Sequence, residues 1–123
     1  MTSAEHIRTV VEQYVKFVGA GATEDIVKLY APDAVIEDPA GSEPRRGHDA
    51  IREFYRSLEP LKKETELLTV RVAGKAAAFW FRLSTEAGEQ TMNLSPIDVM
   101  HFGDDGKVLS MKAYWSQDDL ELV

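Results

Sequence analysis

Five side chains that could donate or exchange protons fall on apolar stripes of this sequence of 123 residues. They are the carboxyls of Asp38 and Asp98 and the phenols of Tyr14, Tyr30 and Tyr55. None has an obvious cation on its own face, and two carboxyls in one dry pocket can have pKa values far apart. One would then be an ionised base and the other a neutral donor. Such a pair with a tyrosine suits removal of a proton beside a carbonyl, because the donors stabilise the enolate oxygen.

Each of these residues also has a purely structural interpretation. An aspartate before Pro39 is often a turn former whose carboxylate accepts backbone N–H groups, and for Asp38 alone this is the simpler interpretation. For Asp98 both interpretations stay open, because a mid-strand aspartate among apolar neighbours is unfavourable. Each tyrosine alone is most simply a core residue with its hydroxyl bonded to backbone or water. Their joint occurrence favours the chemical interpretation.

The two carboxyls are predicted to lie on strands. Residues 34–38 alternate so that Asp38 shares an apolar face with Ala34 and Ile36. A second strand, predicted over residues 90–102, places Asp98 as the one charge on a face of otherwise apolar residues. Pro96 predicts a bulge or a short unpaired position just before Asp98, because proline cannot donate a backbone hydrogen bond.

The three tyrosines are predicted to lie on helices. Thr2 and Glu5 have the spacing of a capping box, which opens a helix that ends near residue 19 and carries Tyr14 in its buried stripe. Thr23 is predicted to cap a short second helix that carries Tyr30 and stops before Pro32. A third helix, which Pro60 ends, has an inward stripe of Ile51, Phe54, Tyr55 and Leu58.

From residue 64 onward the apolar period changes to two, which indicates strands. The predicted strands carry Leu68, Val70 and Val72, then Ala77, Phe79, Phe81 and Leu83 along one face, and finally Leu109, Met111, Ala113 and Trp115. Residues 39–47 are predicted to be a loop, in which Arg45-Arg46 is solvated. We therefore predict a single α+β domain over residues 1–123, with three N-terminal helices packed on one face of a strongly curved, mostly antiparallel sheet.

Composition narrows the function classes. The formal net charge of −7 disfavours nucleic acid and anionic membranes as partners, and no apolar run is long enough for a membrane span. The absence of cysteine excludes a disulfide framework, a thiolate nucleophile and a Cys-ligated zinc site, and the three histidines lack metal-ligand spacing. No phosphate-binding glycine motif appears. We expect a cytoplasmic protein with no metal site.

The sequence resembles the bacterial steroid Δ5-isomerases (ketosteroid isomerases), which have the cone-shaped fold of the nuclear-transport-factor-2-like, SnoaL-like superfamily. The resemblance covers almost the whole chain through Gln13-Tyr14-Val15, Leu29-Tyr30-Ala31, Val35-Ile36-Glu37-Asp38-Pro39, Gly41-Ser42-Glu43-Pro44-Arg45, Ala50-Ile51-Arg52-Glu53-Phe54-Tyr55 and Pro96-Ile97-Asp98-Val99-Met100. The cone fold alone would say little about function, since it hosts unrelated activities.

The resemblance implies a role for each residue that matches. Asp38 corresponds to the base that moves a proton from C4 to C6 of a 3-oxo-Δ5-steroid, and Tyr14 and Asp98 correspond to the oxyanion donors. This family is itself the standard example of that division between two aspartates, so their pKa pattern is taken from the resemblance. Tyr55 and Tyr30 correspond to tyrosines that hydrogen-bond behind Tyr14. The residues that correspond to the apolar steroid cavity are Val18, Phe54, Phe79, Phe81, Leu94, Met111, Ala113 and Trp115.

The family is homodimeric and needs no cofactor, and the resemblance implies the same here. Residues 62–64 and 84–93 and the short C-terminal tail depart from the family pattern. Two alternatives stay open. One is another enzyme on the same fold, such as a polyketide cyclase, dehydratase or epoxide hydrolase, although no predicted inward position offers the histidine that such sites often use. The other is a non-catalytic module that binds an apolar ligand or a partner protein.

Overall fold

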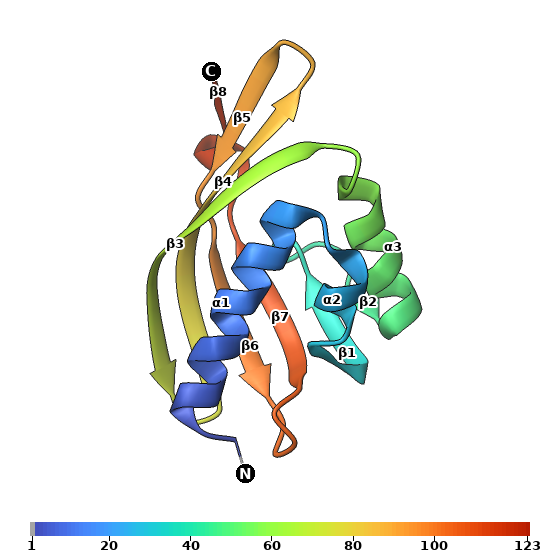
Figure 1. Cartoon of the computed structure of the whole chain (residues 1–123), viewed down its shortest axis with the longest axis vertical. Helices are drawn as coiled ribbons and strands as arrows, with labels where there is room; N and C mark the ends of the chain where they lie inside the picture. Colours follow the sequence, from blue (N-terminus) through green and yellow to red (C-terminus); the bar gives the residue numbers. More distant parts are fainter. Residues whose placement is uncertain (1) are drawn as a thin grey trace.

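The structure is a computed structural model that describes residues 2–123, and in it three α-helices pack against one curved sheet (Figure 1). The helices are α1 (Ala4–Ala20), α2 (Thr23–Val27), α3 (His48–Leu58) and the 3-10 turn η1 (Gln117–Asp119). The strands are β1 (Tyr30–Glu37), β2 (Arg45–Arg46), β3 (Lys62–Ala73), β4 (Ala76–Ala87), β5 (Gln90–Leu94), β6 (Ile97–Phe102), β7 (Val108–Tyr114) and β8 (Glu121–Leu122). The predicted α+β class is confirmed.

The sheet has the strand order β2-β1-β7-β6-β4-β5-β8, and β3 pairs with β4 beside this path. The pairs are antiparallel except that β1 runs parallel to β7. In the parallel pair, β1, which lies between α2 and α3 in the chain, joins β7 from the second half of the chain, and β2 lies outside it. Figure 1 shows β3 and β4 bending across the molecule, with α1 lying along the hollow that they form.

Helix α1 begins one residue later than the capping box predicted. Its N-cap is Ser3, whose hydroxyl accepts a hydrogen bond from the backbone N–H of His6 at 3.0 Å. Thr2 instead donates its hydroxyl to the backbone carbonyl of Gly103. The helix ends at Ala20 and is capped by Gly21, whose φ of 66° is the left-handed conformation typical of helix C-termini. The predicted buried stripe, with Tyr14 at its centre, is confirmed.

Tyr30 was predicted on a helix, but the structure places it at the start of a strand. Helix α2 ends at Val27, and the backbone of Tyr30 pairs with Val108 at the start of β7. Thr23 is the first helical residue and makes no side-chain cap, since Ala22 occupies the N-cap position. Local propensity favoured a longer helix, but pairing with a strand almost 80 positions away along the sequence replaced its last turn.

The strand predicted over residues 90–102 is interrupted where Pro96 predicted a break. β5 ends at Leu94 and β6 begins at Ile97, so both halves pair with β4 at different places along its length. Leu68 and Leu109, which belong to the alternating apolar pattern of the predicted strands, are exposed. Each lies at a register shift: Leu68 between Leu67 and Thr69 in β3, and Leu109 next to Val108 in β7. An extra residue at such a shift turns a side chain to the other face of the sheet.

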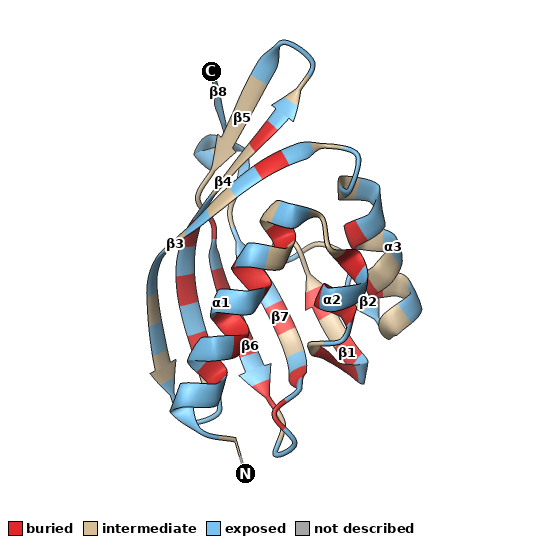
Figure 2. Cartoon of the chain, in the orientation of Figure 1, coloured by how far each residue is buried: buried red, intermediate tan, exposed pale blue. Residues whose placement is uncertain are grey.

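The core lies between the helices and the inner face of the sheet. Figure 2 shows buried residues on the sides of α1 and of the central strands that face each other, and exposed residues on the outer side of α1. It is formed by aliphatic and aromatic residues of α1, α2, α3, β1, β4, β6 and β7. No helix in the part of the chain that the structure describes is long and apolar enough to span a membrane.

Candidate active site

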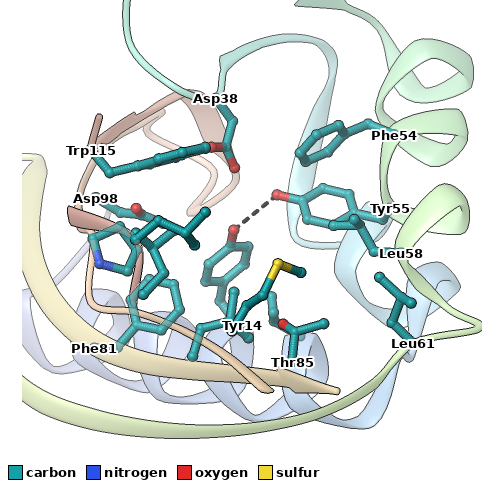
Figure 3. A pocket seen from close by; sticks show the side chains of 16 residues that line it. Tyr14, Asp38, Phe54, Tyr55, Leu58, Leu61, Phe81, Thr85, Asp98 and Trp115 are labelled. Atoms are coloured by element: carbon teal, nitrogen blue, oxygen red, sulfur yellow. Dashed lines mark hydrogen bonds between the residues drawn. The ribbon is translucent and has the colours of Figure 1, made fainter. Parts of the chain in front are cut away.

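One cavity of about 270 Å³ opens between the inner face of the sheet and helices α1 and α3. This volume is near the lower end of the range of about 300 to 1,000 Å³ that small-molecule pockets occupy. The wall is mostly aliphatic and aromatic, with the polar groups of Tyr14, Asp38, Tyr55 and Asp98 gathered in it (Figure 3). Its other lining residues are Val18, Phe54, Leu58, Leu61, Phe81, Leu83, Thr85, Met92, Leu94, Pro96, Trp115 and Leu120.

The three tyrosines form a continuous buried chain of hydrogen bonds. The hydroxyl of Tyr55, on α3, lies 2.9 Å from the hydroxyl of Tyr14, on α1, and 2.9 Å from that of Tyr30, on β1. The first of these contacts is the dashed line in Figure 3. Burial raises the pKa of all three phenols well above its usual value, so they stay protonated. Tyr30 itself lies behind Tyr55 and outside the cavity wall.

Asp98 is the most buried ionisable group of the cavity, with 1% of its surface exposed. It lies on β6, between Phe79 of β4 and Ala113 of β7 in the register of the sheet. Its Oδ1 atom has no hydrogen-bond partner among residues 2–123. Burial, and then the charge of Asp38, raise the pKa of Asp98 well above its usual value. The neutral acid is therefore favoured, and it can donate a hydrogen bond to a ligand.

Asp38 lies directly after β1 and is half-buried. Because β1 and β7 run parallel, their C-terminal ends lie at the same end of the sheet, and Asp38 and Trp115 follow these ends. The indole N–H of Trp115 donates to Asp38 Oδ1 at 2.7 Å. Burial raises the pKa of Asp38, whereas the Trp115 hydrogen bond and the charge of Arg45 act to lower it. The turn-forming role goes to its neighbour Glu37, whose carboxylate accepts the backbone N–H of Gly41 at 3.0 Å.

Arg45 was predicted to be solvated in a loop, but the structure gives it a place beside the site. Residues 45 and 46 form the short strand β2, which pairs with β1 at Val35 and Ile36. The guanidinium carbon of Arg45 lies 4.5 Å from the centre of the Phe54 ring, a cation–π contact. Its charge lowers the pKa of Asp38. Sequence pattern carries no signal for this contact, since it depends on β2 folding back on β1.

Three residues that were predicted to line the cavity lie in the core instead. Phe79, Met111 and Ala113 are buried on the inner face of the sheet, but they do not reach the cavity wall that the structure describes. Phe79 packs edge-on against the Tyr14 ring, with ring centres 5.9 Å apart, and so lies beneath the donor. The other five predicted lining residues, Val18, Phe54, Phe81, Leu94 and Trp115, do line the cavity.

Six lining residues were not predicted from the sequence: Leu58, Leu61, Thr85, Met92, Pro96 and Leu120. Most lie on or next to stripes that were already recognised as inward-facing, such as Thr85 on β4, Met92 on β5, and Pro96 in the break between β5 and β6. Continuing each stripe to its end would have found them. Within residues 2–123, no group of three or more His, Cys, Asp or Glu side chains could hold a metal ion.

The fold and the cavity together define a cone-shaped α+β protein with two aspartates and two tyrosines in the wall of a mostly apolar pocket. The family description "SnoaL-like domain" matches residues 11–111. A solved structure reported for the epoxide hydrolase/cyclase-like enzyme SalBIII, which has a role in pyran ring formation in the polyether salinomycin, covers 100% of both chains with a TM-score of 0.92. Its sequence identity is 24%, so this likeness shows a shared fold.

The curated relatives are more specific. The chain is 47% identical over 118 residues to the steroid Delta-isomerase of Nocardioides simplex, which covers 96% of this chain and 95% of that protein. It is also 43% identical over 49 residues to the epoxide hydrolase LasB of Streptomyces lasalocidi, which covers 39% of this chain and 17% of that protein. The chain therefore belongs to the SnoaL-like family and, within it, to the steroid Delta-isomerases.

Proposed function

We propose that this protein isomerises 3-oxo-Δ5-steroids to their conjugated Δ4 isomers by moving a proton within the substrate. The observation that carries the proposal is that one apolar cavity holds a half-buried Asp38 together with Tyr14 and a fully buried Asp98. The near full-length identity to a steroid Delta-isomerase supports the substrate class. Flat, apolar rings suit a wall that is mostly aliphatic and aromatic.

In the proposed reaction, the ionised carboxylate of Asp38 removes a proton from C4 of the steroid, and the C–H electron pair forms a dienolate. The charge that develops on the C3 oxygen is stabilised by hydrogen bonds from the Tyr14 hydroxyl and the neutral acid of Asp98. Asp38 then returns the same proton to C6, the double bond moves into conjugation, and the carboxylate is restored. No oxidant or reductant is consumed.

The hydrogen-bond chain behind Tyr14 supports its role as a donor. If Tyr30 donates to Tyr55 and Tyr55 donates to Tyr14, the proton of Tyr14 remains available for the ligand. Asp98 lines the same cavity as Tyr14, and its neutral acid can donate a hydrogen bond there, although its Oδ1 atom is enclosed in the wall without a partner. A ligand oxygen between the two groups would accept a hydrogen bond from each.

The test is to add a 3-oxo-Δ5-steroid to the pure protein and to follow the ultraviolet absorbance of the conjugated enone. We expect turnover by the wild-type protein. Asp38→Asn should lose about 100- to 10,000-fold in rate, the range for a general base, and should still bind a phenolic steroid that resembles the dienolate. No turnover by wild-type protein would rule out the isomerase. Hydration of an epoxide substrate instead would favour the other cone-fold enzymes.

We further propose that the protein acts as a homodimer. Trp80, Ile97 and Tyr114 are 44%, 48% and 49% exposed, and the strand register places them side by side on the outer face of β4, β6 and β7. Aromatic residues with one aliphatic neighbour are typical of the centre of a protein interface. Sedimentation should give about twice the monomer mass of 13.8 kDa, and Trp80→Glu should shift the equilibrium to monomers. A wild-type protein that sediments as a monomer would contradict this proposal.

A further inference from the structure

Thr85 is a buried polar residue of the cavity wall for which the proposed reaction has no use. The inward-facing side chains of β4 alternate as Phe79, Phe81, Leu83 and Thr85, so the strand directs this hydroxyl to the same side as the aromatic rings. Thr85 is 9% exposed. Thr85 lines the cavity, and none of the side-chain hydrogen bonds described within residues 2–123 uses its hydroxyl.

The hydroxyl lies at the opposite end of the cavity from the reacting groups. Asp98 faces Phe79 in the register of the sheet, and Thr85 is six positions farther along β4, where it faces Met92. At about 3.3 Å per residue, this separation is at most about 20 Å along the curved strand. Figure 3 shows Thr85 across the cavity from Asp38. A ligand of several fused rings could therefore place one oxygen at Asp98 and its far end toward Thr85.

The surroundings of Thr85 indicate an uncharged ligand group. Leu61, Leu83 and Met92 line the cavity with it and offer no charge. The nearest cation in the register is Lys63, directly across from Thr85 on β3. Its ammonium group donates to the backbone carbonyls of Leu58 and Leu61, and Lys63 does not line the cavity. A carboxylate or sulfate at this end of a ligand would therefore have no counter-charge, whereas a ketone or hydroxyl oxygen would find one neutral partner.

We propose that Thr85 is a specificity-determining residue, and that its hydroxyl binds an uncharged oxygen at the end of the substrate remote from the reacting carbonyl. On a steroid held by its C3 oxygen, this is a ketone or hydroxyl oxygen at C17. The inference rests on the proposed function for the orientation of the substrate. A site built around a polar group discriminates against a ligand that lacks the matching atom, because its own group is then left unpaired.

The experiment compares two 3-oxo-Δ5-steroids that differ in having or lacking an oxygen at C17. Thr85→Val keeps the size and branching of the side chain and removes the hydroxyl, whereas Thr85→Ser keeps the hydroxyl. We expect Thr85→Val to lower kcat/KM for the oxygenated steroid about 3- to 10-fold, the effect of one neutral hydrogen bond. The value for the steroid without the C17 oxygen should change less, so the ratio of the two kcat/KM values should fall. Thr85→Ser should retain the preference for the oxygenated substrate.

Equal effects of Thr85→Val on both steroids, or no effect on either, would overturn the inference. A Thr85→Ser variant that behaves like Thr85→Val would do the same. A second readout is the equilibrium binding of two phenolic steroids that differ in the C17 oxygen, which needs no turnover. If no steroid is isomerised but this binding preference depends on Thr85, the proposed function fails and oxygen recognition stands. If turnover occurs and neither readout depends on Thr85, the proposed function stands and this inference fails.

Discussion

The carboxyl of Asp98 should make the protein less stable as the pH rises. In the unfolded chain this group has its ordinary pKa near 3.8, and burial raises its pKa well above that value in the folded protein. Below pH 3.8 both states carry the proton, and the neutral group is buried without a charge penalty. Above that pH the unfolded chain releases its proton while the folded chain retains it. Stability that is present in acid is therefore lost progressively up to the raised pKa.

The size of this effect follows from proton linkage. A difference of one bound proton changes the free energy of unfolding by about 1.4 kcal/mol for each pH unit. This is a large fraction of a typical total stability of about 5 to 15 kcal/mol. Asp98→Asn keeps a neutral side chain of nearly the same shape and cannot ionise. The variant should therefore gain stability relative to the wild-type protein as the pH increases.

The measurement is urea unfolding of the two proteins at equal concentration, from about pH 5 to about pH 8. The matched control is Asp118→Asn, which neutralises an exposed carboxylate in η1. We expect the difference in unfolding free energy between Asp98→Asn and wild type to rise with pH, and the control to show no such rise. Parallel curves for Asp98→Asn and wild type would refute the assignment of a retained proton to Asp98.

Three further perturbations test the surroundings of the site. Tyr14→Phe should lower kcat about 100- to 1,000-fold, the value of one oxyanion donor, so unchanged steroid turnover would dismiss Tyr14 as a donor. Trp115→Phe removes a hydrogen bond that favours the Asp38 carboxylate, so the pKa of Asp38 should rise. The acid limb of the plot of kcat/KM against pH should then move to higher pH, and a shift to lower pH would contradict this. Lys63→Met loses two charge-assisted hydrogen bonds at the end of α3 and should destabilise the fold by about 1 to 3 kcal/mol in urea unfolding. A variant as stable as the wild-type protein would show that these bonds make no net contribution to stability.

Much of the fold could be predicted from the sequence because helices and strands leave different apolar periods. The stripe of α1 identified Tyr14, the stripe of α3 identified Tyr55, and the alternation of β6 identified Asp98 as an inward carboxyl. The break at Pro96 was predictable because proline has no backbone N–H to donate to a strand. Each of these inferences uses only neighbours within a few residues.

The errors occurred where distant parts of the chain meet. Tyr30 had the local pattern of a helix, and pairing with β7 made it the first residue of a strand. Arg45 reaches the site only because β2 folds back on β1, and Leu68 and Leu109 turn outward at register shifts that no local pattern marks. Long-range pairing overrides local propensity because tertiary packing supplies most of the stability of any one element.

Away from the register shifts, the sequence by itself determined which side chains point inward, since alternation along a strand and the helical period are properties of the backbone. It did not determine how deep in the cone each inward side chain would lie. Phe79 and Thr85 share one face of β4, yet Phe79 packs into the closed core and Thr85 opens into the cavity. Only the curvature of the sheet and the position of α1 over it decided between core and cavity, because both depend on contacts between elements that are far apart in the chain.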